Sequence, residues 1–190
     1  MVNDSSIAGV NMQNTDIMKK LRGPKGTSVR VKVLRRGVKD LIEFKIVRDK
    51  IPIFSLDAAY MVDDEIGYIK INRFSSTTFA EYKTAFEKLK KKGMKSLILD
   101  LQDNGGGYMS AAIELADDFL SGGKMLVYTE GANQLKETHE STAVGDFESG
   151  NLVILVNESS ASASEIVSGA IQDWDRGVIV GRRTFAKGLV

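Results

Sequence analysis

The chain has 190 residues, 43% of them apolar, which is enough for one domain with a sizeable core, alone or with part of another. Its 26 basic and 25 acidic residues nearly cancel, so bulk charge gives no reason to expect binding to nucleic acid or anionic lipid. Cysteine is absent, which excludes disulfides and thiolate chemistry. No stretch approaches the roughly 18 consecutive apolar residues of a membrane helix. The first residues also lack the basic and apolar regions of a signal peptide.

The first 48 residues predict a small, incomplete unit. Residues 15–21 are typical of a short helix, and residues 28–34 and 40–47 alternate apolar with polar side chains as two strands of a hairpin do. One helix and one hairpin are too little for a well-sealed core. Residues 49–65 are expected to connect this unit to the next, and Pro52 biases Ile51 away from helix.

From residue 66 onward, strands alternate with helices, which favours an α/β layer structure. The strand predicted at 96–101 is nearly all apolar and is expected to be buried on both faces of a largely parallel sheet. Further strands are predicted at 66–71, 125–130, 152–157 and 177–181, and helices around 79–89, at 108–120 and at 162–172. The single histidine, His139, lies in a polar stretch and is expected to be a solvated loop residue.

Two strand-to-helix junctions carry residues suited to chemistry. In the first, "DLQDNGGGYM", the glycines at 105–107 allow backbone N–H groups to approach a phosphate or a developing oxyanion. Neither a Walker ending nor a dinucleotide fingerprint is present. Asp100 and Asp103 lack a clear third ligand, so we predict no metal site. A tight turn without function remains an alternative.

The second junction is "SASASEIVSG", residues 160–169. Ser162 and Glu165 have the spacing of a capping box, yet the same position would place a hydroxyl where helix N–H groups stabilise negative charge. A serine attacks only with the help of a base. Since no suitable histidine exists, a lysine or carboxylate must serve. Lys187 lies among apolar and small residues, which would favour its neutral form by desolvation. A plain helix cap and a solvated surface lysine remain the alternatives.

The stretch "SASASEIVSGAIQDWDRGVIVGRRTFAKG", together with "LILDLQDNGGG" and "IGYIKINRF", resembles the C-terminal processing (tail-specific) serine peptidases of family S41. The resemblance implies a Ser-Lys peptidase with a crotonase/ClpP-like α/β core over residues 66–190. It also implies that residues 1–48 are the C-terminal part of a PDZ domain, the domain that gates substrate entry in that family. No cofactor is implied.

Carried over to this chain, the resemblance makes Ser162 the nucleophile and Lys187 the general base. The backbone N–H groups of Gly106 and Ala163 would form the oxyanion hole. Supporting roles are implied for Glu165, Asp173 and Thr184.

The implied activity is endopeptidase cleavage of proteins near their C-termini. The partners would be proteins or peptides with free C-termini. The location would be the cell envelope, the periplasm or outside the cell. The exposed strand edges of the first unit favour self-association into a homo-oligomer. Gln102 stands where the family commonly has arginine, and Ala186 where it has glycine, which would strain a turn of positive φ. The family's third catalytic residue, a glutamine, would follow Val190.

Two other functions remain open from the sequence. A catalytically impaired, peptidase-like binding or scaffold module is the first, and the substitutions at Gln102 and Ala186 favour it. A crotonase-type acyl-thioester enzyme is the second, but that chemistry would not need the pair Ser162 and Lys187.

Overall fold

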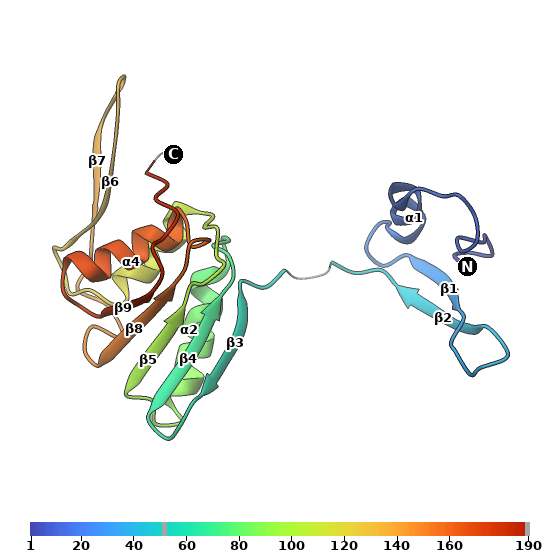
Figure 1. Cartoon of the computed structure of the whole chain (residues 1–190), viewed down its shortest axis with the longest axis horizontal. Helices are drawn as coiled ribbons and strands as arrows, with labels where there is room; N and C mark the ends of the chain where they lie inside the picture. The colour runs from blue at the N-terminus through green and yellow to red at the C-terminus, as the bar shows by residue number, and fades with distance from the viewer. Residues whose placement is uncertain (51–52, 189–190) are drawn as a thin grey trace. The chain divides into compact units, whose positions relative to one another are not determined.

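A computed structural model describes residues 1–50 and 53–188, and the chain divides into two compact units, Met1–Ile53 and Phe54–Val190 (Figure 1). The bias expected at Ile51 falls outside the described residues.

The first unit contains the helix and the hairpin that the sequence predicts. Helix α1 spans Asn14–Leu21, and strands β1, Ser28–Val33, and β2, Ile42–Val47, pair antiparallel. Within residues 1–50, the buried apolar side chains are those of Val2 and Val29, and α1 buries none of its residues. The unit therefore has very little core of its own. Its assignment to a PDZ domain stays a prediction.

The second unit is built on a five-stranded sheet in the order β3-β4-β5-β8-β9. Strand β3 is antiparallel to β4, and the remaining neighbours are parallel. The strands are β3 (Leu56–Met61), β4 (Ile66–Ile71), β5 (Ser96–Asp100), β8 (Asn151–Val156) and β9 (Val178–Gly181).

Strand β3 corrects the expected boundary, because it lies inside the segment 49–65 that was predicted to be a connector. Its sequence, Leu-Asp-Ala-Ala-Tyr-Met, lacks the regular alternation that marks a half-buried strand. Pairing with β4 supplies the backbone hydrogen bonds that its own pattern does not predict. The core therefore begins at Phe54 rather than at residue 66.

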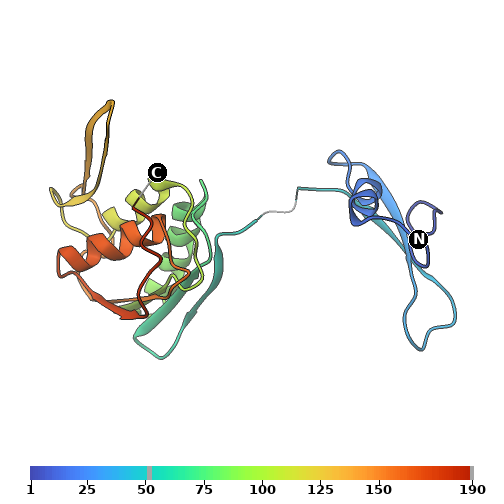
Figure 2. The ribbon, with the colours of Figure 1, turned by 45° about the horizontal axis from the view of Figure 1, so that its top comes forward.

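Three helices cover one face of this sheet: α2 (Thr78–Lys90), α3 (Met109–Asp117) and α4 (Ala163–Asp173) (Figure 2). The prediction that β5 is buried on both faces is wrong, because Leu97 and Leu99 are buried against the helices whereas Ile98, on the other face, is only partly covered. Strand register places Ile98 in an apolar row on that open face with Tyr60, Tyr68, Val153 and Val178.

A hairpin of β6 (Met125–Gly131) and β7 (Gln134–Glu140) extends from the second unit (Figure 1). Strand β7 was not predicted, since its sequence is polar and its structure comes from pairing with β6. His139 therefore lies on a strand, opposite Val127, and not in a solvated loop as expected. Its Nε2 is buried and has no hydrogen-bond partner among the described residues.

The topology brings the two chemical junctions together. Strands β5 and β8 are adjacent and parallel, with Asp100 opposite Leu155, so the loops that follow them leave the sheet at the same edge. In open α/β sheets, this carboxyl edge is where ligands bind. The glycine turn (residues 105–107) follows β5, and the serine-rich stretch (residues 160–169) follows β8. Both therefore lie at that edge.

Candidate active site

The glycine turn packs directly against the start of α4. A Cβ atom at Gly106 would lie 2.8 Å from Ser162 Cβ and 2.7 Å from the Ala161 carbonyl oxygen. Gly106 also has a φ of +94°, a conformation that favours glycine. Close approach and backbone conformation thus both require glycine at this position.

The three alternating serines have different surroundings. Ser160 is buried and its Oγ donates to the Leu101 carbonyl at 2.8 Å, and the buried Ser164 donates its hydroxyl hydrogen to the Asn104 carbonyl at 2.9 Å. Both hydroxyls therefore tie the α4 region to the loop after β5. Ser162 alone of the three is partly exposed and lines a cleft, which makes it the accessible nucleophile of the set.

Ser162 is held in an unusual backbone conformation. It is the N-cap of α4, with φ 55° and ψ −111°. A side chain other than glycine in such a region costs about 1–3 kcal/mol and persists only where its surroundings impose it. A sharp, strained turn from a strand into a helix exposes the nucleophilic serine of α/β-hydrolases in the same way.

The Glu165 carboxylate joins α4 to the segment that follows β9. Its Oε2 accepts the N–H of Ser162 at 2.8 Å and the N–H of Lys187 at 3.0 Å. Its Oε1 accepts the Thr184 hydroxyl at 2.8 Å and the N–H of Ala186 at 2.6 Å. Burial raises the pKa of Glu165, but these hydrogen bonds outweigh it and hold the pKa below its ordinary value.

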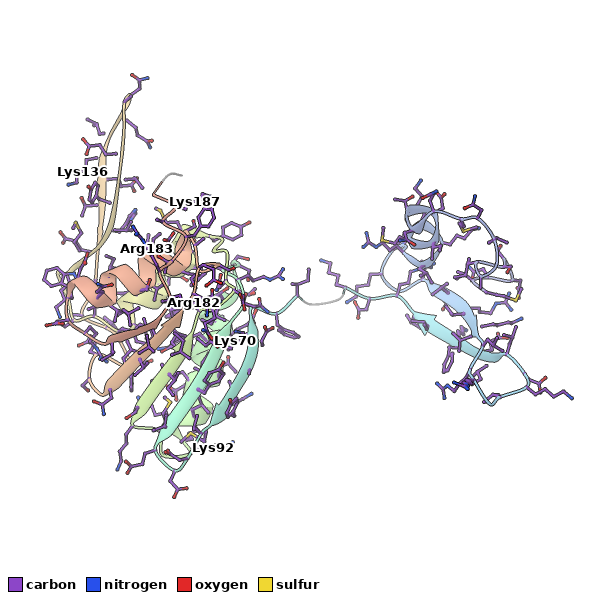
Figure 3. All side chains as sticks on the ribbon, viewed as in Figure 1. Lys70, Lys92, Lys136, Arg182, Arg183 and Lys187 are labelled. Atoms are coloured by element: carbon purple, nitrogen blue, oxygen red, sulfur yellow. The ribbon has the colours of Figure 1, made fainter. Side chains whose placement is uncertain are left out.

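Lys187 follows β9 and lines the same cleft as Ser162, and its side chain is labelled in Figure 3. The enclosure predicted around it is not formed by the described residues, because Lys187 is exposed and Phe185 is 64% exposed. Ala186 has a φ of +64°, so an alanine occupies the conformation that glycine would adopt without strain.

The cleft has a volume of about 700 Å³ and lies between α4 and β6. Of the residues expected to support the site, Glu165 and Thr184 lie where the start of α4 contacts the segment that follows β9. Asp173 also lines the cleft, but it is the last residue of α4, roughly 16 Å of helix away from Ser162. Asp173 therefore borders the far part of the cleft rather than the candidate nucleophile. The apolar or small lining residues are Met109, Leu126, Val127, Ile166, Gly169, Ala170 and Gly188.

The two expected oxyanion donors differ in whether their N–H groups already have a hydrogen-bond acceptor. Ala163 is the first residue of α4, and N–H groups at this position have no partner within the helix. The N–H of Gly106, in contrast, donates to Asn104 Oδ1 at 2.9 Å. Asn104 was not predicted to have a role, and no local signal in "DNGGG" distinguishes it from an ordinary turn residue.

Asp100, considered above as a metal ligand, is engaged with protein groups. Its Oδ2 accepts hydrogen bonds from Tyr68 Oη at 2.5 Å and from Lys70 Nζ at 3.2 Å, and its Oδ1 accepts one from the N–H of Gln102 at 2.8 Å. Burial, together with the neighbouring Asp100, raises the pKa of Tyr68 well above its ordinary value. Across residues 1–50 and 53–188, no three His, Asp or Glu side chains are grouped as a metal site would need.

The backbone strain at Ser162 predicts that glycine gives a more stable variant than alanine at this position, the reverse of the order expected within a helix. We expect Ser162→Gly to be more stable than Ser162→Ala by about 1 kcal/mol, because glycine relieves the positive φ. Ser168, within α4, is the matched control, and there the glycine variant should be the less stable by about 1 kcal/mol. Denaturant unfolding of the four variants measures both differences. The same order at both positions would contradict strain at Ser162.

The lowered pKa of Glu165 predicts a pH-dependent contribution to stability. A carboxylate with a depressed pKa stabilises the fold above its unfolded-state pKa, and this contribution is lost as the pH falls through the folded-state pKa. The Tm of Glu165→Gln should therefore be below that of the original chain at pH 7, and the gap should close on acidification. The exposed Glu114→Gln serves as control. A gap that stays constant with pH would disprove the role of the carboxylate charge.

Comparison with known proteins agrees with this geometry. Residues 65–190 match peptidase family S41. The chain is 36% identical over its full length to a "Probable CtpA-like serine protease" of Staphylococcus aureus strain N315, of which it covers 37%. It is 37% identical over 90% of its length to the "Carboxy-terminal-processing protease" of Bartonella bacilliformis, of which it covers 40%. The chain thus spans well under half the length of these relatives.

Among solved structures, the photosystem II D1 C-terminal processing protease matches the whole chain with a TM-score of 0.65 and 28% identity, and 52% of that protein is covered. Together, the matched residues, the α/β sheet and the relatives of both kinds establish that this chain belongs to peptidase family S41.

Proposed function

We propose that the protein is a serine endopeptidase in which Ser162 is the nucleophile and Lys187 the general base, and that it cleaves protein substrates near their C-termini. The observation that carries this proposal is the shared carboxylate of Glu165. It bonds the backbone of both residues and so holds the accessible serine and the lysine at one cleft.

The reaction is acyl transfer to water. Lys187, in its neutral form, takes the proton of the Ser162 hydroxyl as Oγ attacks the peptide carbonyl carbon. The N–H of Ala163 and the glycine turn stabilise the oxyanion, an effect typically worth a few kcal/mol per donor. Lys187 then protonates the leaving amine, and water, giving its proton to Lys187, hydrolyses the acyl-enzyme. The protonated lysine finally returns its proton to Ser162 Oγ. This chemistry needs no cofactor.

The cleft supports an extended peptide as the substrate. It is long, because it runs beside α4 from Ser162 to Asp173, and its lining combines apolar or small residues with polar and charged ones. The printed names of two relatives, a carboxy-terminal-processing protease and the D1 C-terminal processing protease, support cleavage near C-termini. We also propose that the protein acts in the cell envelope or outside the cell, as the family resemblance implies. No helix within residues 1–50 and 53–188 is long and apolar enough to cross a membrane.

Two observations favour a second candidate, the impaired binding or scaffold module. Ala186 is strained beside the candidate base, and the N–H of Gly106 is occupied by Asn104. Both features would weaken catalysis without affecting peptide binding. Retained Ser162 and Lys187 at one cleft argue for the enzyme.

Substitutions at the serines and the lysine test the proposal. In the whole protein, Ser162→Ala should abolish cleavage of an unfolded protein substrate. Ser160→Ala and Ser164→Ala should lose stability, because each deletes a buried hydrogen bond, yet retain turnover. Lys187→Arg should lose nearly all activity, since a guanidinium stays protonated. Normal turnover by either the Ser162 or the Lys187 variant would refute the assignment.

The exposed apolar surface of the chain predicts self-association. The open face of the five-stranded sheet carries Tyr60 and Val178, which are 50% and 59% exposed. Burial of such a face against a second copy would be favourable. We expect light scattering to give a mass above the 20.8 kDa of one chain, rising with concentration. Val153→Lys, on that face, should reduce it, and Leu135→Lys, 91% exposed on the hairpin, should not. A strict monomer would count against this prediction.

A further inference from the structure

Asn104 is fully buried, and both the nitrogen and the oxygen of its side-chain amide form hydrogen bonds. Its Nδ2 donates to the Ile71 carbonyl at 2.8 Å, at the last residue of β4. Its Oδ1 accepts the N–H of Gly106 at 2.9 Å. The side chain therefore ties the glycine turn to the end of a central strand.

The backbone carbonyl of Asn104 makes two further contacts, and these reach α4. It accepts the N–H of Ala161 at 3.0 Å and the hydroxyl of Ser164 at 2.9 Å. These partners lie on either side of Ser162 in the sequence. One residue thus fixes β4, the glycine turn and both flanks of the candidate nucleophile.

A second buried asparagine shows that this pattern is not general. Asn157 bonds through its side chain to Asp103 and to the N–H of Ser159. Those contacts join the two loops, but none of them reaches the glycine turn or the residues on both sides of Ser162. The arrangement of partners around Asn104 is therefore particular to that residue.

We propose that Asn104 is a positioning residue for the reaction of Ser162, which sets the separation between the glycine turn and the nucleophile. This inference rests on the proposed function. Asn104 itself touches no reacting atom and acts through Gly106 and through the backbone that carries Ser162.

The hydrogen bond from Gly106 to Asn104 could also oppose the reaction. The two roles predict opposite changes in reaction rate when the Asn104 side chain is removed. If Asn104 Oδ1 only competed with the oxyanion for the N–H of Gly106, then its removal would free that donor and speed the reaction. If Asn104 positions the turn, its removal releases the turn from β4 and slows the reaction. A charged oxyanion is a stronger acceptor than a neutral amide oxygen, so the N–H can be shared while the amide stays in place.

The experiment compares Asn104→Ala and Asn104→Asp with Tyr82→Phe in the 190-residue chain. Tyr82 is a matched control, because its buried hydroxyl donates to Asp118 at 2.9 Å in the helix layer and its loss removes one buried hydrogen bond elsewhere in the core. Two quantities are measured well below the unfolding temperature of each variant. The first is the rate of covalent labelling of Ser162 by an alkyl fluorophosphonate, and the second is amide hydrogen exchange at Gly106 and Ala161, whose N–H groups donate to the side chain and to the carbonyl of Asn104.

Asn104→Ala should label at least tenfold more slowly than the original chain and exchange faster at both amides. Asn104→Asp keeps an acceptor for the N–H of Gly106, so it should keep the protection of that amide, but its charged carboxylate competes with the oxyanion and should not restore the labelling rate. Tyr82→Phe should lower the unfolding temperature and leave both readouts unchanged. If Asn104→Ala does not fold, the Asp variant alone decides, by lost protection at Ala161, whose N–H donates to the Asn104 carbonyl.

Equal or faster labelling of folded Asn104→Ala would overturn the inference. Failure of the original chain to label would count against the proposed function instead. In that case hydrogen exchange still decides the role of Asn104, because unchanged protection at Ala161 would overturn it.

Discussion

The bonds of one carboxylate, that of Glu165, set the geometry of the candidate site. It lies one turn into α4 and accepts hydrogen bonds from Ser162 behind it and from three residues, Thr184, Ala186 and Lys187, that follow β9. Hydrogen bonds to an ionised acceptor are about twice as strong as neutral ones. Without this carboxylate, the segment that carries Lys187 would keep few of the contacts that now hold it against α4.

Backbone strain appears at two of the four residues that donate hydrogen bonds to this carboxylate. Ser162 and Ala186 both have positive φ without being glycine, and each donates its N–H to Glu165. Such conformations persist only where surrounding contacts impose them, and they gather at functional sites. On the other side of Ser162, Asn104 fixes the glycine turn, so the nucleophile is held between two polar anchors.

Much of the fold follows from sequence patterns, because the apolar spacing of α2 matches its burial and the apolar residues of β4, β5 and β8 predict strands, although β5 is fully buried on one face only. Strands β3 and β7 do not follow in this way, since pairing with a neighbour and not their own pattern makes them strands. Within the site, the spacing to Glu165 marks Ser162 as a helix cap, and only the family resemblance identified it, rather than Ser160 or Ser164, as the nucleophile. The structure separates the three serines by burial and by hydroxyl partners. Asn104 could not be found this way, because its partners are distant in sequence.

The central claim is that Glu165 brings Ser162 and Lys187 together as a reacting pair. Its most direct test is the separation of Ser162 Oγ and Lys187 Nζ in a crystal structure of the whole protein. The account predicts hydrogen-bond reach, about 2.6–3.2 Å, with Glu165 accepting N–H groups from both residues. A Lys187 Nζ directed away from Ser162, with the Glu165 carboxylate turned to solvent, would contradict it.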